Sequence, residues 1–450
     1  MHAAPTNTPR TLALGLAIGV VIVALTGALA GPIDPPPGPV ASTNKTLEEV
    51  EPRTPLAGPG LITIGEPGSY YLTGNIEATG TAVQITTDGV TLDLNGYTIE
   101  GPGGIDIGSF GIQIDLSRAI ARPVVILNGT VTNFGRAGIV STQELDELVL
   151  SDLTISRCEV GVQTAARARI ERVAANVNDT DGFSLSGQSV IRASTARSNG
   201  GTGFRVQAGS LHECLADANA GDGFSLGGFA GDLPVGTTLR GCTSTRNTLT
   251  GFDALGPAVF EACTATGNTV RGFQAVSDVV YRACNASENA GTGYFVDQGN
   301  AVLEACAASS NTGNGITVGR RSVLHACTAS ENTSFGIRTS RFSLVTSCVA
   351  GGNTFDGYNL AEESRAYNCT AADNLGDGFF IATGGTLDSC SAMRNGEDDF
   401  VGSLGSLVIR CTARNNTDSD FMFSSSSRRG TVITPTGEFS SLNAFANISY

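Results

Sequence analysis

A cysteine that returns at nearly constant spacing constrains the fold of this chain more than any other feature. Asn stands five residues after each of these cysteines, and an aromatic residue or Ile stands ten after it, usually preceded by Gly. The same frame continues backward, with Ser194 and Val173 in the cysteine position. The cysteines, mostly 21 residues apart, are Cys214, Cys242, Cys263, Cys284, Cys306, Cys327, Cys348, Cys369, Cys390 and Cys411. A fixed period of this kind indicates a solenoid in which each repeat forms one coil.

The residues between the repeated positions decide which solenoid is expected. Leucine is sparse, so a leucine-rich repeat is disfavoured, whereas Gly (58 of 450 residues), Thr, Ser and Asn are abundant. This composition suits short strands joined by tight corners. We therefore predict an all-β fold: a single-stranded parallel β-helix with coils of about 21 residues, spanning residues 60–425.

One coil shows how the repeat is read. Side chains alternate along a strand, so Cys284 and Ala286 share one face, which we predict to be the interior. Tyr281 and Tyr294 are also expected inside, with a corner before the cysteine and three short strands per coil. Asn289 is expected at a corner, where Asn accommodates left-handed backbone angles and bonds to the backbone, or bonds to Asn of the next coil.

The cysteines themselves admit three readings. An inward column of free thiols fills space as Ala or Val would, and this is the reading we expect. Disulfides between adjacent coils are an alternative, although parallel side chains hold the Cβ atoms wider apart than a relaxed bridge prefers. A metal site is the third, but His212/Cys214 and His325/Cys327 lie several coils apart and lack clustered spacing. We predict no metal centre and no cofactor, with Ca²⁺ left open.

The N-terminus predicts export. Arg10 precedes a long apolar run, and Ala28-Leu29-Ala30 offers a small-x-small cleavage site, so residues 1–30 are expected to be a signal peptide. The run is close to spanning length, which leaves an uncleaved membrane anchor as the alternative. Either places the protein outside the cytoplasm, secreted or in the cell envelope. Residues 31–59 are expected to be a Pro-rich linker and N-terminal cap, and residues 426–450 a C-terminal cap or tail.

Two motifs carry a family resemblance. They are the apolar-x-x-Cys-x-Ala-x-x-Asn-x-x-x-Gly-aromatic unit and VTLDLNGYTI at residues 90–99. Together they resemble the right-handed parallel β-helix repeat proteins of the pectin-lyase-like superfamily, over roughly residues 60–425. The resemblance implies a right-handed helix. It does not imply one activity, because the fold hosts lyases, hydrolases, epimerases and adhesins.

Cleavage of a polysaccharide needs paired carboxylates, or a basic side chain with calcium-binding acids. The hydrolases of this superfamily carry Asn-Thr-Asp, Asp-Asp and Gly-His-Gly in neighbouring coils. Here 416–418 matches the first tripeptide and 398–399 the second, in reversed order, and the third is missing. The catalytic candidates are Asp398, Asp399, Asp418 and Asp420. Each also has a reading as a corner or solvated surface residue.

The outward positions give the binding candidates. Thr, Ser and Asn dominate one and three residues after the cysteine, which predicts a hydroxyl-rich, nearly uncharged strip. An insertion at 226–236 offers Phe229 and Leu233, and Arg282 and Phe295 occupy positions that vary between coils. We predict an exported, monomeric, non-catalytic surface or carbohydrate-binding protein whose partner is a polysaccharide or cell-surface component. The alternative is a lyase or glycoside hydrolase acting on acidic polysaccharide. The net charge of −15 argues against nucleic acid.

Overall fold

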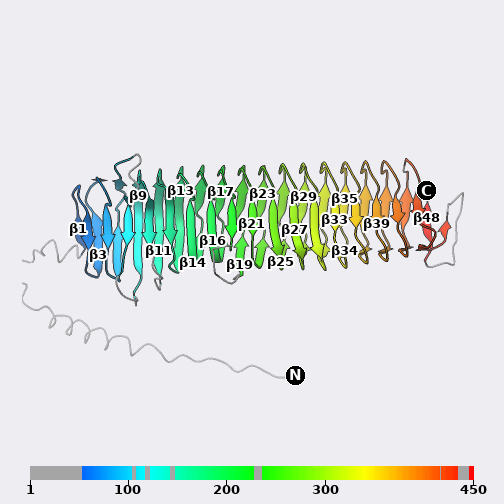
Figure 1. Ribbon diagram of the computed structural model, residues 1–450, viewed down its shortest axis with the longest axis horizontal. Coiled ribbons are helices and arrows are strands. Elements are labelled where there is room, and N and C mark those ends of the chain that lie inside the picture. The colour runs from blue at the N-terminus through cyan, green and yellow to red at the C-terminus, as the bar shows by residue number, and fades with distance from the viewer. Residues whose placement is uncertain are drawn as a thin grey trace, which may run out of the picture. The chain divides into compact units, whose positions relative to one another are not determined.

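A computed structural model describes residues 53–103, 108–116, 122–141, 147–227, 236–415, 417–433 and 445–449. The predicted signal peptide and most of the linker lie outside these residues. From Arg53 onward the chain forms one compact unit, in which the strands stack along a single axis (Figure 1). Every regular element of the described residues is a strand, and all the pairings between strands are parallel. No helix in these ranges has the length and apolar character needed to span a membrane.

The early coils contain longer and less regular strands. In β9, β11 and β13 the first and second strands of a coil run together, and in β14 and β16 the third strand continues into the next coil. These early strands are β1 (Thr54–Leu56), β2 (Ile62–Ile64), β3 (Gly68–Leu72), β4 (Ile76–Glu77), β5 (Val83–Ile85), β6 (Val90–Asp93), β7 (Thr98–Glu100), β8 (Ile112–Ile114), β9 (Val124–Thr132), β10 (Ala137–Ser141), β11 (Leu148–Ser156), β12 (Val160–Thr164), β13 (Ala168–Asn176), β14 (Phe183–Arg192) and β16 (Phe204–His212).

The later coils each contribute three short strands. The first strands are β19 (Thr237–Arg240), β22 (Ala258–Glu261), β25 (Val279–Arg282), β28 (Val302–Glu304), β31 (Val323–His325), β34 (Leu344–Thr346), β37 (Arg365–Tyr367), β40 (Thr386–Asp388), β43 (Leu407–Ile409) and β46 (Arg428–Arg429). The second strands are β15 (Thr195–Arg197), β17 (Leu215–Asp217), β20 (Thr243–Thr245), β23 (Thr264–Thr266), β26 (Asn285–Ser287), β29 (Ala307–Ser309), β32 (Thr328–Ser330), β35 (Val349–Gly351), β38 (Thr370–Ala372), β41 (Ser391–Met393) and β44 (Thr412–Arg414). The third strands are β18 (Phe224–Leu226), β21 (Phe252–Ala254), β24 (Phe273–Ser277), β27 (Tyr294–Gly299), β30 (Ile316–Arg320), β33 (Ile337–Thr339), β36 (Tyr358–Leu360), β39 (Phe379–Ile381), β42 (Phe400–Gly402) and β45 (Phe421–Phe423). Two short strands follow, β47 (Val432–Ile433) and β48 (Asn447–Ser449).

The corners are made by single residues in the left-handed conformation. Ala283, just before the cysteine, has φ 49°, and Glu288, just before the asparagine, has φ 55°. The same two positions recur in the neighbouring coils. The corner before the cysteine is therefore confirmed. The expectation that Asn289 itself takes the left-handed angle is wrong, because its neighbour Glu288 makes the turn.

The asparagine column is instead a hydrogen-bonded ladder through the wall of the helix. Asn289 Nδ2 donates to Asn311 Oδ1 of the next coil at 2.9 Å and to the Ala265 carbonyl of the previous coil at 3.1 Å. The backbone N–H of Asn289 also donates to Asn311 Oδ1, at 3.1 Å. A buried amide with this many partners carries little desolvation cost, so the ladder fastens each coil to the next.

Close packing explains the glycine before each aromatic residue. A Cβ added at Gly293 would lie 2.6 Å from the Gly315 carbonyl oxygen and 2.8 Å from Asn311 Nδ2. No other residue has room there. The glycine column thus follows from the ladder, because the ladder brings the backbones of adjacent coils together at this point.

The thiols fill the interior beside the alanines. All eleven cysteines are free and buried, and ten of them form the reduced column that the repeat predicts. Cys284 Sγ donates to the carbonyl oxygen of Arg282 at 3.3 Å, and this contact recurs along the column. Cys158 lies outside this column, at the asparagine position of its coil, where its backbone N–H donates to Asn178 Oδ1 at 3.1 Å. Burial is the main cause that raises the pKa of Cys158 to about 11. A buried thiol is inaccessible to a substrate, so the column supports the core rather than chemistry.

Stacked aromatic rings continue the core. Phe273 and Tyr294 lie with their ring centroids 4.9 Å apart and their planes 3° apart. The hydroxyls of Tyr281 and Tyr294 are buried and have no hydrogen-bond partner among the described residues. In contrast, the Tyr358 hydroxyl donates to the Thr370 carbonyl at 3.2 Å.

This difference predicts that replacing Tyr by Phe changes the free energy of unfolding in opposite directions at the two kinds of position. Tyr281→Phe and Tyr294→Phe should each raise the free energy of unfolding by about 1 kcal/mol, because an unpaired buried hydroxyl is removed. Tyr358→Phe should lower it by about 1 kcal/mol, because a hydrogen bond is lost. Chemical denaturation of the three variants beside the parent protein measures these changes. A loss of stability in all three would contradict this account of the two unpaired hydroxyls.

Candidate functional site

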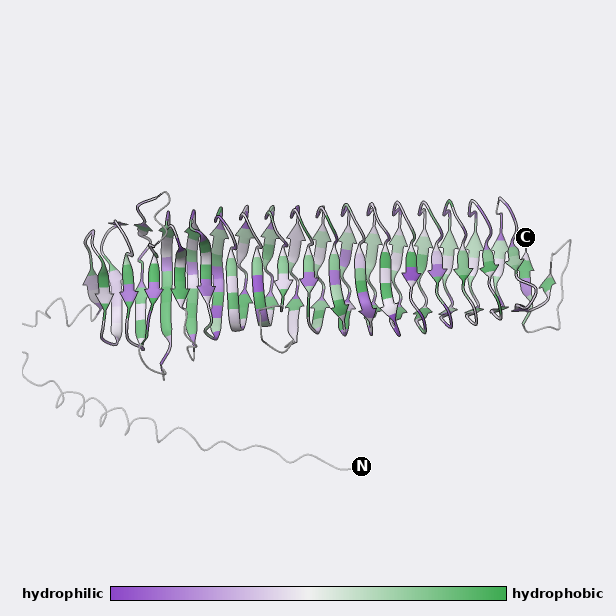
Figure 2. Ribbon diagram, viewed as in Figure 1, coloured by the Kyte–Doolittle hydropathy of each residue, from purple (hydrophilic) through white to green (hydrophobic). Residues whose placement is uncertain are grey.

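The outward side chains of the third strands are the most varied on the helix. Strand register brings Gln274, Phe295, Thr317, Arg338 and Asn359 side by side on β24, β27, β30, β33 and β36. Outward residues alternate with buried apolar ones at the start of β27 and β30. Figure 2 shows hydrophilic and hydrophobic segments along the strands. We call this surface the third-strand face. Its rigid backbone fixes the spacing of side chains that differ in chemistry from one coil to the next.

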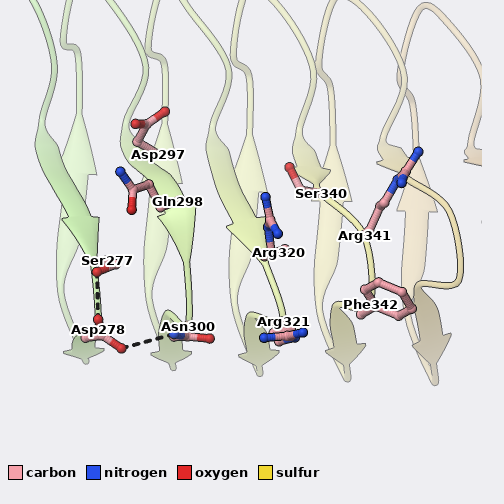
Figure 3. Close-up of a pocket in the computed structure, with 10 residues that line it drawn as sticks. All are labelled: Ser277, Asp278, Asp297, Gln298, Asn300, Arg320, Arg321, Ser340, Arg341 and Phe342. Carbon is pink, nitrogen blue, oxygen red and sulfur yellow. Dashed lines mark hydrogen bonds between the residues drawn. The ribbon is translucent and has the colours of Figure 1, made fainter.

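The third-strand face ends in a polar hollow of about 850 Å³. Asp278, Asn300, Arg321 and Phe342 follow one another at the corner, one from each coil (Figure 3). The remaining lining residues are Ser277, Asp297, Gln298, Arg320, Ser340 and Arg341. We call this site the arginine hollow. A second hollow of about 280 Å³ adjoins it, sharing Asp297 and Ser340 and adding residues such as Arg338 and Asn359.

The two ends of the arginine hollow differ in charge. Asp278 accepts hydrogen bonds from the Ser277 hydroxyl at 2.6 Å and from Asn300 Nδ2 at 3.1 Å. These two contacts, Ser277 first, lower the pKa of the Asp278 carboxyl, so it is ionised at neutral pH. At the other end Arg341 pairs with Glu362 outside the hollow. Within the described residues neither Arg320 nor Arg321 forms an ion pair.

Aromatic rings accompany these cations. Arg271 lies over the Phe295 ring at 4.0 Å from its centroid. Phe342 has 51% of its surface exposed at the edge of the arginine hollow. Unpaired guanidinium groups beside exposed rings are suited to ligands that combine anionic groups with flat apolar patches.

A pair of carboxyls lies further along the same face. Asp222 precedes β18, and Asp253 lies on β21, the next coil. Burial, and then the charge of Asp222, raise the pKa of Asp253 to about 6, while Arg271 opposes the shift. Burial also raises the pKa of Asp222. Asp253 Oδ1 is buried without a hydrogen-bond partner among the described residues. A carboxyl of this kind can hold or release a proton near neutral pH.

The four predicted catalytic carboxyls lie elsewhere, at the C-terminal end. Asp398 Oδ1 accepts from the Ser419 backbone N–H at 2.9 Å. Asp399 is buried and accepts from Asn395 Nδ2 at 2.7 Å and from the Arg414 N–H at 3.1 Å. Asp418 is exposed, and Asp420 accepts from the Ser449 hydroxyl. Asp398 and Asp399 therefore bond to backbone N–H groups and Asp420 bonds to a serine side chain, and the four carboxyls are not gathered into either hollow.

The predicted binding residues are divided between faces. Arg282 is exposed on β25 of the first strands and lies 3.5 Å from Glu304. Phe295 lies on the third-strand face beneath Arg271. Phe229 and Leu233 lie outside the described residues. The predicted hydroxyl strip faces outward on the second strands, with the alanine between each pair of outward residues buried.

The arginine hollow was not predicted, although its residues are visible in the sequence. Arg320 and Arg341 are 21 residues apart, and the corner series of Asp278, Asn300, Arg321 and Phe342 advances by 22, 21 and 21. Read singly, these arginines are scattered. Read in register with the cysteine period, they form adjacent columns.

A column of stacked carboxyls next to the candidate Asp398 predicts a pH effect on stability. Burial, and then repulsion from Asp356, raise the pKa of Asp377 to about 7. In the unfolded chain the pKa of an aspartate is about 4, so the native state favours the protonated form. This contribution to stability is complete below about pH 4 and is lost as pH rises through about 7.

Asp377→Asn should therefore stabilise the protein at pH 8 by about 1 kcal/mol after allowance for solvent screening, and should change little at pH 4. Asn is compatible with this column, because Asn314 occupies it naturally and accepts the Phe335 N–H at 3.2 Å. Unfolding curves at the two pH values measure the difference. An equal effect at both would exclude the carboxyl charge as its cause.

No group of three or more His, Cys, Asp or Glu side chains in the described ranges is arranged to hold a metal ion. Whether the protein binds Ca²⁺ is left open, as in the sequence analysis.

A family model agrees with this architecture over part of the chain. Residues 81–243 match the family model for a right-handed beta helix region. Among solved structures the chain is similar to the Dettilon tailspike protein, with 13% identity over 67% of this chain and 59% of that chain and a TM-score of 0.43. It is also similar to the A-module of the mannuronan C-5 epimerase AlgE4 of Azotobacter vinelandii, with 14% identity over 80% and 90% of the two chains and a TM-score of 0.34. A third similar structure is the periplasmic alginate epimerase AlgG, at 9% identity, 81% and 77% coverage and a TM-score of 0.29.

The chain spans 59% of the length of the tailspike protein. A search of curated proteins gave no match. The described residues form a parallel β-helix with coils of about 21 residues, and residues 81–243 match the model of a right-handed beta helix region. At these identities the similarity concerns the fold, and the function has to be argued from the surface.

Proposed function

We propose that this β-helix is an exported, non-catalytic carbohydrate-binding protein that holds an acidic polysaccharide along its third-strand face. The observation that carries the proposal is the arginine hollow, in which Arg320 and Arg321 lack carboxylate partners among the described residues. The proposal specifies the third-strand face rather than the hydroxyl strip as the main binding surface.

The chemistry of an acidic sugar matches the order of side chains along this face. The planar guanidinium of Arg320 or Arg321 can bind a uronate carboxylate through two parallel hydrogen bonds. Asp278, ionised and fixed by Ser277 and Asn300, can accept hydrogen bonds from sugar hydroxyls. Phe342 offers an apolar surface to the face of a sugar ring. A polymer fits such a site better than a small molecule, because the two hollows together extend over several coils.

Binding to a panel of polymers tests the proposal. Immobilised acidic polysaccharides, such as polygalacturonate and alginate, should retain the protein, and neutral polymers of the same length should not. Retention should fall as salt rises, because partly exposed charges are screened. Equal retention by neutral polymers, or none by any polymer, would contradict the proposal. N-terminal sequencing of the protein recovered outside the cells tests its export and the expected cleavage after Ala30.

The carboxyl pair favours one second candidate, an enzyme acting on the same polysaccharide. Asp253, with its pKa near 6, can serve as a general acid or base beside Arg271. Incubation with the bound polymers distinguishes the two functions. New reducing ends or unsaturated products that disappear in Asp253→Asn would establish the enzyme. Asp398→Asn serves as the matched control, because the Asp398 carboxyl bonds to the backbone.

A further inference from the structure

The outward face of the first strands carries an unbroken apolar column that has no part in the proposed glycan site. It consists of Val259, Val280, Val302, Val323 and Leu344, and strand register places each beside the next. Val302 and Val323 each have 37% of their surface exposed. Single exposed valines need no explanation, but four valines and a leucine aligned in successive coils form a continuous apolar stripe, of which Val259, Val280 and Leu344 are half-buried. We call it the valine column.

A row of charges runs parallel to the valine column, two residues further along each strand. Its signs alternate: Arg240 is followed by Glu261, then Arg282, Glu304 and His325. Arg240 lies 2.6 Å from Glu261, and Arg282 lies 3.5 Å from Glu304. These side chains are about half exposed, so each retains capacity for a second partner of opposite charge.

We propose that this face binds a second copy of the chain, with the two helices antiparallel about a two-fold axis that runs along the strands between β25 and β28. Such an axis sets each column against itself in reversed order. Val280 then lies opposite Val302 of the partner subunit. Arg282 lies opposite the partner's Glu304, and Glu261 lies opposite the partner's His325.

The alternation of charge is what selects this arrangement. A parallel dimer, with its axis along the helix, would set Arg282 against the partner's Asp278. It would also set Glu304 against the partner's Asn300 and His325 against the partner's Arg321. Fewer opposite charges would meet, and one contact would be repulsive when the histidine is protonated. The antiparallel dimer instead pairs valine with valine and acid with base over the same coils.

The size of the contact sets the concentration at which the dimer should form. Five coils at about 4.8 Å spacing give an apolar column about 20 Å long, which is short for a permanent interface. We therefore expect weak, concentration-dependent association. The arginine hollow borders the column, because Asn300 and Arg321 stand two residues before Val302 and Val323. The dimer does not rest on the proposed function, and self-association and polysaccharide binding are measured separately.

Sedimentation velocity of the purified protein tests the dimer. The weight-average mass should rise toward twice the monomer value between about 5 and about 500 µM, the range in which small interfaces form. Val302→Lys places like charges near the axis and should abolish the rise. Val349→Lys is the matched control, because Val349 is 42% exposed on β35 of the second-strand face and should leave association unchanged. A constant monomer mass, or equal effects of the two variants, would overturn the proposal.

Disulfide cross-linking tests the orientation. The native thiols are buried, so an introduced surface cysteine is the reactive one. Val259→Cys and Val323→Cys proteins, mixed and oxidised, should cross-link with each other, because the axis sets these positions opposite. Each variant alone should not, since its two thiols would be about three coils, or about 14 Å, apart. Cross-linking of either variant with itself would show a parallel dimer. Loss of polysaccharide binding in Val302→Lys, without self-association of the parent, would assign the column to a glycan.

Discussion

Asn332→Ala should lower the free energy of unfolding by about 4 kcal/mol, because it breaks the asparagine ladder in the middle of the helix. Asn332 Oδ1 accepts from the backbone N–H and the Nδ2 of Asn311, at 3.1 and 3.0 Å. Its Nδ2 donates to Asn353 Oδ1 at 3.0 Å and to the Ala308 carbonyl at 3.2 Å. Alanine leaves several of these buried groups without a partner, and each costs about 1–3 kcal/mol.

Chemical denaturation of Asn332→Ala and of Thr333→Ala, its exposed neighbour, measures the effect. Thr333→Ala should stay within about 0.5 kcal/mol of the parent protein. Because coils contact only their neighbours, the break should also make unfolding less cooperative, with the two sides of the helix melting separately. Equal stability of the two variants would show that the ladder is not what joins the coils.

The second large effect concerns binding. Replacing both Arg320 and Arg321 by Gln should weaken binding to an acidic polysaccharide by about 100-fold, because hydrogen bonds between charged groups contribute about 1.5–3 kcal/mol each. The substitution keeps a polar side chain and removes the charge. Binding to polygalacturonate in titration calorimetry measures the loss.

Arg197→Gln is the control for the Arg320 and Arg321 variant. Arg197 is half exposed on β15, a second strand, and lies 3.8 Å from Asp217. It should affect binding less than threefold, since its contact with a polymer would only be a screened surface contact. An equal loss in the control would mean that positive charge anywhere on the surface, and not the arginine hollow in particular, governs binding.

Much of the fold could be predicted because the same residue types recur at the same positions in every coil. The inward positions of Cys284 and Ala286 and the corner before the cysteine follow from alternation and from the period. The left-handed residue could not be assigned, because Ala283 and Glu288 have no intrinsic preference for that angle. Coil stacking holds them there, and the hydrogen bonds of the Asn289 ladder fix the second corner.

The candidate site was less predictable, because it is built from residues that depart from the repeat. Asp398 and Asp399 form a short motif, yet their carboxyls accept hydrogen bonds from backbone N–H groups of the next coil. Arg320 and Arg321 carry no motif at all. They become a site only when Asp278, Asn300 and Phe342 of neighbouring coils are placed beside them. Such columns become visible in the sequence only when the repeats are aligned one below another at their spacing of about 21 residues.

Chemical footprinting of arginine tests the central claim most directly, because it reads the binding surface on the unmodified chain. Phenylglyoxal modification can be followed at each arginine by peptide mass spectrometry, with and without polygalacturonate. The polymer should slow the modification of Arg320 and Arg321 at least about tenfold and leave Arg197 unchanged, as expected for guanidinium groups held in paired hydrogen bonds. Unchanged rates at Arg320 and Arg321 in the presence of bound polymer would contradict the assignment of the third-strand face as the glycan surface.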